Sequence, residues 1–327
     1  GLLGFALTGK PLELKFHYSP EFADKIRRLV SAVEFDVVHI EHSHMALYVG
    51  ALPSGANCRR VLAFHNVTFD QYGKIYRVEQ GLEKKTRAFL YSMMMRRWEP
   101  RYAGRFDRCL VVSEPDRALL MAANPSLQVD VIPNGVDTQK CQPLGQVGAP
   151  PTLLFVGWMG YSPCVDAVLH FCREILPRVR RTVADAEMCI VGADPTPEVM
   201  RLGGNGVHVT GRVDDVVPYY RQASVCVVPL RAGGGTRLKI LEAMALGRPV
   251  VSTTVGCEGL DVTDGEHILI ADDPEQFAAK TVRLLTDGAL RQHITANARR
   301  LVETRYDWDA LAAQLTRIYA ELTNSRA

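Results

Sequence analysis

The residues best suited to chemistry lie between positions 231 and 243, where three consecutive glycines precede a hydroxyl, two cations and a carboxylate. In order they are Gly233, Gly234, Gly235, Thr236, Arg237, Lys239 and Glu242. Glycines let a phosphate approach the backbone closely. Glu242 lies three residues beyond Lys239, on the same face of a helix, and its carboxylate can accept two hydrogen bonds from a diol. A phosphate beside a diol points to the ribose diphosphate of a nucleotide.

A strand, a turn and a helix are expected to position these residues. Residues 225–230 form an apolar run typical of a buried strand, and residues 237–246 have a helical pattern that ends at Gly-Arg-Pro. The glycines therefore lie at a helix N-terminus, where free backbone N–H groups and the helix dipole attract anions. The alternative is a glycine turn of structural use only, with Lys239 and Glu242 as a solvated ion pair.

The order GGGTRLKILEAMALGRPVV resembles the donor-binding motif of the retaining family 4 glycosyltransferases, which are two-domain enzymes of the GT-B fold. That family usually has two glutamates separated by seven residues. Glu242 matches the second, which holds the donor's ribose, whereas Gly234 stands in place of the first. The resemblance implies a nucleoside diphosphate sugar, of UDP or GDP type, as donor. It implies neither a cofactor nor a required metal.

Loops after other strands of the second half carry the remaining donor-site expectations. The family typically has Gly-Arg-Leu and then a lysine after its first strand, whereas this chain has Gly157 and Trp158. A leaving diphosphate needs cations or preorganised donors, and Arg237 and Lys239 are the natural substitutes. The departures occur together in a subgroup of these enzymes, which argues against an inactive protein.

Two further loops of the second half are assigned through the resemblance. Arg212 and Val213 match a loop that holds the nucleobase, largely through backbone groups; ordinary turn chemistry around Gly211 is the alternative. Glu258 follows the strand after the helix, in a loop that would border the sugar. Our hypothesis is that Glu258 compensates for the missing first glutamate.

In the first half, the sequence AFHN places His65 directly after an apolar strand, at the carboxyl edge of a sheet where open α/β folds bind ligands. A neutral imidazole can hydrogen-bond a sugar hydroxyl. A single histidine in such a position is more often structural, but the resemblance implies contact with the donor sugar. His65, Lys239 and Glu242 are the candidate catalytic residues.

Two other clusters invite a metal interpretation that we do not favour. His39, His42 and His44 lack the second ligand group that would complete a four-ligand site. Asp307 and Asp309 open the predicted C-terminal helix, where acidic residues favour the helix dipole, so helix capping explains them better than metal binding. In the family, histidines near the end of the strand that contains His39 line the acceptor side of the cleft.

Strands alternate with helices along the whole chain, which predicts doubly wound parallel sheets. With the turn sequence PNGVD at 133–137, the resemblance implies two Rossmann-like domains facing a cleft. We expect an acceptor-side domain over 1–137, a linker over 138–151, a donor-binding domain over 152–304 and a helix over 305–327 that crosses back. The first domain supplies fewer strands than the family's and lacks its glycine-rich first loop, so we expect it to be incomplete.

Composition restricts the partners more than the reaction. A net charge of +2 over 327 residues gives no reason to expect nucleic acid as a partner. The eight cysteines show no metal-binding spacing, no apolar run is long enough to span a membrane, and residues 1–9 lack a basic leader, so we expect a cytoplasmic protein. The helix expected over 80–102 is basic and rich in methionine. We interpret it as a helix with a methionine-lined core face, and peripheral contact with the inner face of a membrane is the alternative.

The sequence thus predicts a glycosyltransferase of polysaccharide biosynthesis that moves a sugar from a nucleoside diphosphate sugar to a hydroxyl of a glycan or a lipid-linked saccharide. Two alternatives stay open. One is a nucleotide-sugar epimerase on the same double fold, and the other is a nucleotide-sugar-binding protein without catalysis.

Overall fold

The computed structural model describes residues 12–53, 55–79, 81–145 and 150–324, which form two compact units. The first unit comprises Gly1–Pro133, Gly234–Thr236 and Ala312–Ala327, and the second comprises Asn134–Gly233 and Arg237–Leu311. The stretch 1–9, position 80 and part of the linker expected over 138–151 lie outside the described residues.

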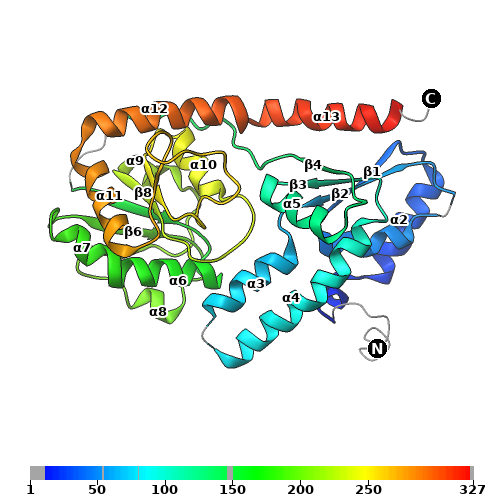
Figure 1. The fold of residues 1–327 in the computed structure, drawn as a ribbon, viewed down its shortest axis with the longest axis horizontal. Coiled ribbons are helices and arrows are strands. Elements are labelled where there is room, and N and C mark those ends of the chain that lie inside the picture. The colour runs from blue at the N-terminus through cyan, green and yellow to red at the C-terminus, as the bar shows by residue number, and fades with distance from the viewer. Residues whose placement is uncertain (1–11, 54, 80, 146–149, 325–327) are drawn as a thin grey trace. The chain divides into compact units, whose positions relative to one another are not determined.

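A four-stranded parallel sheet, in the order β1-β2-β3-β4, forms the centre of the first unit (Figure 1). Its strands are β1 (Val37–Glu41), β2 (Arg59–Phe64), β3 (Arg108–Val111) and β4 (Val129–Val131). The helices are η1 (Leu12–His17), α2 (Pro20–Ala32), η2 (Ser43–Ala51), α3 (Thr68–Val78), α4 (Leu82–Ala103) and α5 (Glu114–Ala123). Ser19 caps α2, accepting a hydrogen bond of 3.1 Å from Phe22 N.

The second unit contains a six-stranded parallel sheet in the order β10-β9-β8-β5-β6-β7. Its strands are β5 (Thr152–Val156), β6 (Glu187–Val191), β7 (Val207–Val209), β8 (Val225–Val228), β9 (Val250–Ser252) and β10 (Leu269–Ile270). The helices are α6 (Ser162–His170), η3 (Phe171–Ile175), α7 (Leu176–Arg180), α8 (Pro197–Met200), α9 (Val217–Gln222), α10 (Leu238–Ala245), α11 (Pro274–Thr286) and α12 (Gly288–Arg305). The last helix, α13 (Trp308–Asn324), continues into the first unit.

Strand order in the second sheet determines where a ligand can bind. The chain runs from β5 outward through β6 and β7, then returns to β8 on the other side of β5 and continues through β9 to β10. The order therefore reverses between β5 and β8, and open α/β sheets bind ligands at the carboxyl ends of strands beside such a point. The glycine turn (residues 233–235) follows β8, and Gly157 follows β5.

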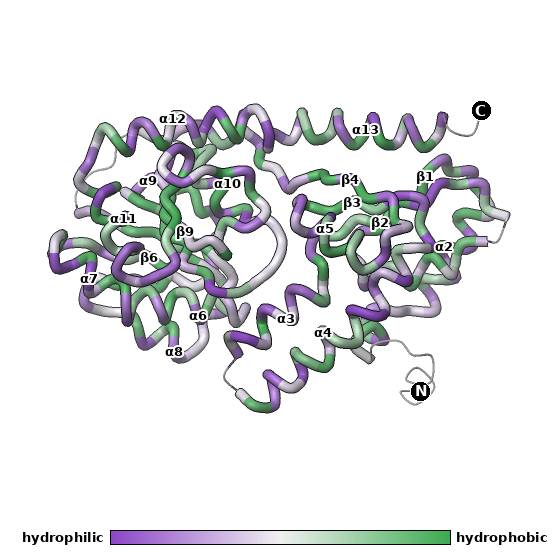
Figure 2. Tube along the Cα trace, viewed as in Figure 1, coloured by the Kyte–Doolittle hydropathy of each residue, from purple (hydrophilic) through white to green (hydrophobic). Residues whose placement is uncertain are grey.

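The central strands of the second sheet are apolar because both of their faces are buried. All four residues of β8 are buried, as expected for a parallel strand, and Figure 2 shows hydrophobic colouring along strands of both sheets. On the first sheet, Ile318 and Leu322 of α13 pack with Val61 and Leu110 in one cluster. The expected fold class, two α/β units with parallel sheets, is confirmed.

Two helical segments of the structure are irregular or differ from expectation. The helical stretch from Ser162 to Arg180 is interrupted by the π-helical turn η3 and resumes at Leu176-Pro177, where proline has no N–H to continue the hydrogen-bond ladder. The methionine-lined core face is wrong for Met93 and Met94, which are 49% and 37% exposed, while Met95 is fully buried. Three consecutive residues cannot share one face of a helix with 3.6 residues per turn.

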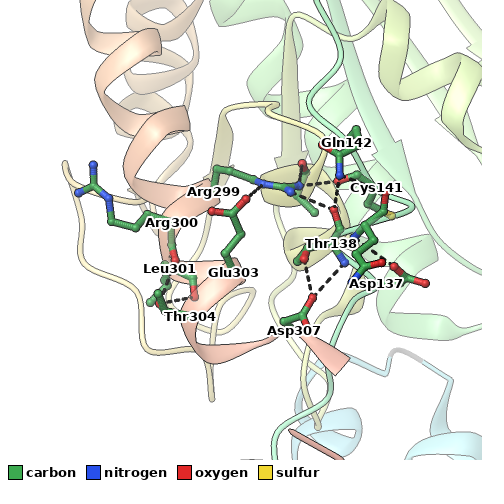
Figure 3. Close-up of polar contacts among 12 residues, drawn as sticks. Asp137, Thr138, Cys141, Gln142, Arg299, Arg300, Leu301, Glu303, Thr304 and Asp307 are labelled. Atoms are coloured by element: carbon green, nitrogen blue, oxygen red, sulfur yellow. Dashed lines mark hydrogen bonds and ion pairs between the residues drawn. The ribbon is translucent and has the colours of Figure 1, made fainter. Parts of the chain in front are cut away.

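Polar contacts join α12 to the segment after PNGVD and to α10 (Figure 3). Arg299 of α12 donates hydrogen bonds to Thr138 O at 2.9 Å and to Ala245 O at 2.6 Å. The second contact places a cation on the last turn of α10, the helix that follows the glycine turn. Asp307 accepts hydrogen bonds from Thr138 and, at 2.9 Å, from Asp309 N, so its predicted role as a cap of α13 is confirmed.

Candidate functional site

Backbone conformation explains two of the three glycines after β8. Gly233 has φ 125° and Gly235 has φ 71°, in a region that residues with a β-carbon rarely adopt. Gly234, which stands where the family has its first glutamate, does not have a positive φ. The turn therefore requires glycine on either side of position 234. It leads into α10, which begins at Leu238, one residue later than predicted.

Lys239, on the first turn of α10, directs its amine toward β5. Its Nζ atom lies 4.1 Å from the centroid of the Phe155 ring and 3.9 Å from Cys164 Sγ. A β-carbon at Gly157 would lie only 2.7 Å from this Nζ atom, so the glycine makes room for the amine. Burial lowers the pKa of Lys239, which means that its charge is poorly compensated by the protein.

Glu242 is one turn further along α10 and is held by a tyrosine that sequence reasoning missed. The Tyr220 hydroxyl, from α9, lies 3.2 Å from Glu242 Oε2, to which it can donate, and 3.3 Å from Lys239 O. Burial raises the pKa of Glu242. Tyr220 is 22 positions away in the sequence, and nothing in its helix signals this contact.

The loop after β5 depends on close backbone packing with the loop after β6. A β-carbon at Gly192 would lie 1.6 Å from Gly157 O, so any side chain there would force the two loops apart. The neighbouring Trp158 is 58% exposed and donates from Nε1 to Asp194 Oδ2 at 2.8 Å. Where the family has an arginine, this chain therefore presents an indole anchored to the adjacent loop.

The other predicted donor residues belong to loops at the same end of the second sheet. Arg237 is buried and donates to Val255 O at 3.4 Å, which joins the glycine turn to the loop that contains Glu258. Glu258 is half-buried in that loop, whereas Arg212 is exposed and Val213 half-buried after β7. The structure thus brings the Lys239 amine against Gly157 and places Glu242 within electrostatic range of Lys239, and the roles of these residues in binding stay predictions.

His65 lies in the first unit, directly after β2, where its Nε2 atom is 2.8 Å from Glu41 Oε2. Thr236 and the neighbouring Gly234 and Gly235 also group with the first unit. Sequence reasoning missed Glu41. The available signal was its place at the end of β1, in register with Ala63 of β2, two residues before His65.

A hollow of about 950 Å³ lies at the opposite end of the second sheet. Its lining includes Pro151, Ser224 and Pro249, which directly precede β5, β8 and β9. It is therefore at the amino ends of the strands, away from the glycine turn. Across the described ranges of the chain, no three His, Cys, Asp or Glu residues form a group that could hold a metal ion.

Comparison with known proteins gives consistent matches over both halves. The family described as Glycosyltransferase Family 4 matches residues 4–140, and the one described as Glycosyl transferases group 1 matches residues 150–287. The phosphatidyl-myo-inositol mannosyltransferase of Mycobacterium leprae is 29% identical over 328 residues, covering 95% of this chain and 80% of that protein.

Solved structures show the same fold. Sucrose-phosphate synthase from Thermosynechococcus elongatus superposes with a TM-score of 0.75 at 21% identity, covering 94% of this chain and 78% of the other. Anabaena HepE, in a complex with UDP and glucose, gives a TM-score of 0.68 at 16% identity, covering 91% of this chain and 80% of the other.

Proposed function

Because the chain belongs to the group 1, family 4-like glycosyltransferases, we propose that it is a retaining enzyme that moves a sugar from a nucleoside diphosphate sugar to a hydroxyl acceptor. The observation that carries the proposal is the pair on α10. Lys239 lies beside Gly157 and Glu242 lies one turn further along α10, both near the carboxyl ends of β5 and β8, and burial shifts both pKa values in the directions that disfavour the charges. A ligand with a diphosphate and a diol would compensate each of them.

In the proposed mechanism, each group acts on a different part of the donor. Backbone N–H groups at the start of α10, with Lys239 and Arg237, stabilise the negative charge that develops on the leaving diphosphate. Glu242 accepts hydrogen bonds from the ribose hydroxyls, and Tyr220 keeps its carboxylate in place. His65 hydrogen-bonds the donor sugar, and the acceptor attacks from the face that the diphosphate leaves. No metal is required in this scheme.

The donor base and the acceptor are proposed at the level of class. HepE was solved with UDP and glucose, and the mycobacterial relatives are named as mannosyltransferases of phosphatidyl-myo-inositol. We therefore propose a UDP or GDP sugar as donor and a saccharide or lipid-linked acceptor. Within the part of the chain that the structure describes, no helix is long and apolar enough to cross a membrane. A cytoplasmic location, with peripheral contact to a membrane that carries the acceptor, completes the proposal.

Donor binding is the first test. Thermal shift with UDP, GDP and ADP sugars, with and without EDTA, should identify one donor, since a ligand at a hundredfold excess over its Kd adds about 2.7 kcal/mol to the free energy of unfolding. Glu242→Ala should then weaken that donor by about 100-fold in calorimetry, because two hydrogen bonds to a charged group are lost. Glu198→Ala, an exposed glutamate of α8, is the matched control and should bind normally. Unchanged affinity of Glu242→Ala would refute the ribose assignment.

Turnover separates the proposal from its alternatives. The preferred donor is incubated with saccharide and lipid acceptors and the anomeric configuration of the product is read by NMR, which for a retaining enzyme matches that of the donor. An isomerised nucleotide sugar formed without acceptor would indicate an epimerase. Tight donor binding without transfer to any acceptor would indicate a binding protein, and loss of transfer in EDTA would refute metal independence.

A further inference from the structure

Three histidines surround one carboxylate where β1 and β2 end in the first unit. Glu41 Oε2 lies 2.8 Å from His65 Nε2, and Glu41 Oε1 lies 3.2 Å from His39 Nε2. His42 completes this Glu41 cluster, with its ring centroid 4.2 Å from that of His65. The parallel register of β1 and β2 brings these residues together, and His42 N donates to Ala63 O at 2.9 Å.

The carboxylate determines which ring nitrogen of each histidine carries a hydrogen. Hydrogen bonding to His39 and His65 lowers the pKa of Glu41, so the group is an ionised acceptor at neutral pH. An ionised carboxylate has no hydrogen to donate, and each ring nitrogen that faces it must therefore be an N–H donor. In a neutral imidazole the other nitrogen is then a lone-pair acceptor.

His39 satisfies this requirement on its other side. Its Nδ1 atom forms a hydrogen bond with the hydroxyl of Tyr319 on α13, and the two rings meet edge to face with centroids 5.9 Å apart. The phenol donates, and Nδ1 accepts. His39 thus lies between the Tyr319 hydroxyl, to which it is hydrogen-bonded, and Glu41, whose Oε1 atom is in ion-pair contact with Nε2, while the hydrogen bond of Glu41 is made with His65.

His65 is restrained on a second side by an unusual backbone. His42 has φ 67°, a region that few residues with a β-carbon adopt, and this conformation is the one in which its ring packs against His65 at an interplanar angle of 34°. The imidazole of His65 is therefore restrained both by a carboxylate at one edge and by a ring on one face.

We infer that Glu41 is a positioning residue that fixes His65 as the Nε2–H tautomer and leaves Nδ1 as the acceptor for a hydroxyl of the donor sugar. The inference rests on the proposed function and deepens it. Glu41 acts through His65. The alternative is an ordinary surface ion pair, since the Glu41 side chain is 57% exposed, and such a pair would fix no tautomer that transfer depends on.

The test measures the tautomer of His65 and the rate of sugar transfer in the same variants. Long-range ¹H–¹⁵N correlation spectra at about pH 8, where an ordinary histidine is neutral, report which nitrogen of His65 is protonated, and His65→Ala assigns the signal. We expect Nε2–H in the parent protein and a mixture with Nδ1–H in Glu41→Gln, because the amide can either donate or accept. We expect kcat/KM for transfer to fall by about 10- to 100-fold, the size seen when a group that orients a histidine is removed.

A matched pair controls for surface effects. Glu187 lies 3.5 Å from His208 in the second unit, and Glu187→Gln should change neither the His65 tautomer nor the rate of transfer. Glu41→Asp keeps the charge and should retain the parental tautomer, which provides a second variant if Glu41→Gln folds poorly by circular dichroism.

The possible results separate the inference from the proposed function. An unchanged His65 tautomer in Glu41→Gln, or Nδ1–H in the parent, overturns the inference whatever the activity. A changed tautomer with an unchanged rate overturns the link to transfer. If the parent transfers no sugar, the proposed function fails while the spectra still decide whether Glu41 fixes His65.

Discussion

Two glutamates, one in each unit, face opposite electrostatic conditions. Glu242 of the second unit is largely enclosed, and burial raises its pKa. Glu41 of the first unit is more than half exposed, and hydrogen bonds from histidines lower its pKa. The difference lies in stabilisation by neighbours, since imidazoles stabilise the Glu41 carboxylate through hydrogen bonding, whereas the neighbours of Glu242 are a tyrosine hydroxyl and a lysine whose own charge is disfavoured by burial.

This comparison suggests how the two regions contribute. Groups whose charge costs free energy in the absence of ligand gain most when a ligand of complementary charge arrives, and natural proteins accept such a cost at functional sites. A carboxylate that its neighbours already stabilise gains little from a ligand and instead orients those neighbours. We therefore expect changes around Gly157 and Lys239 to alter donor affinity, and changes in the Glu41 cluster to alter the geometry of His65.

The largest expected effect distinguishes backbone packing from ligand binding in the second unit. In Gly192→Ala the new methyl group would meet Gly157 O at 1.6 Å, and we expect the free energy of unfolding to fall by about 4 kcal/mol. In Gly157→Ala the new methyl group would meet the flexible end of Lys239 at 2.7 Å and Cys164 and Phe155 at 3.1 Å, so we expect a smaller loss of stability, of about 1 to 2 kcal/mol. Displacement of the amine should nevertheless weaken donor binding by about 10-fold.

Urea unfolding and calorimetry with the preferred donor would measure both effects. Gly50→Ala, where a β-carbon meets nothing within 4 Å, is the control for glycine replacement in general. If Gly157→Ala bound donor normally, the amine of Lys239 would not be the group that needs this space.

A smaller effect sharpens the idea that the second unit keeps an uncompensated charge. Lys239→Met retains a long side chain against Phe155 while removing the amine. We expect donor affinity to fall by about 30-fold, because a cation beside the diphosphate is lost, and we expect the free protein to become more stable. Lys140→Met, at a lysine that is 87% exposed, should change neither quantity. A free protein destabilised by Lys239→Met would contradict the proposed cost of the buried amine.

The sequence predicts the buried strands and the glycine turn with its helix, and the reason is physical. Parallel strands are buried on both faces, so β5 and β8 appear as apolar runs, and the residues from Gly233 to Glu242 are close in sequence because one turn and one helix carry them. Contacts between different helices, strands and loops could not be predicted from the sequence. The hydrogen bond from Tyr220 to Glu242 and the approach of Gly192 to Gly157 depend on how helices and loops pack, which no local pattern encodes.

The Glu41 cluster illustrates the same limit in the first unit. The sequence HIEHSH drew attention to histidines as metal ligands, but the partner that matters for His65 is the glutamate between them. Glu41 and His65 meet because β1 and β2 pair in a particular register, and only the folded sheet defines that register.

The smallest expected effect is the change in the free energy of unfolding with pH, which distinguishes Glu41 from Glu242. The folded-state pKa of Glu41 is below its ordinary value of 4.5, so its contribution to stability is present above about pH 4.5 and is lost as the pH falls further. The folded-state pKa of Glu242 is above 4.5, so its ionisation costs stability at neutral pH, and the cost disappears as the pH falls through that pKa. The two carboxylates should therefore respond to acid with opposite signs.

Glu41→Gln and Glu242→Gln make the signs measurable by urea unfolding in steps from about pH 7 to pH 3. Glu41→Gln should be less stable than the parent at neutral pH, by at most about 1 kcal/mol because solvent screens the exposed pair, and the deficit should shrink below about pH 4.5. Glu242→Gln, which keeps an acceptor for the Tyr220 hydroxyl, should be more stable than the parent at neutral pH and lose that advantage in acid. If both variants were less stable, or both more stable, than the parent at neutral pH, Glu41 and Glu242 would not differ in the way that their pKa shifts indicate. Glu242 would then have to be treated as a structural residue of α10.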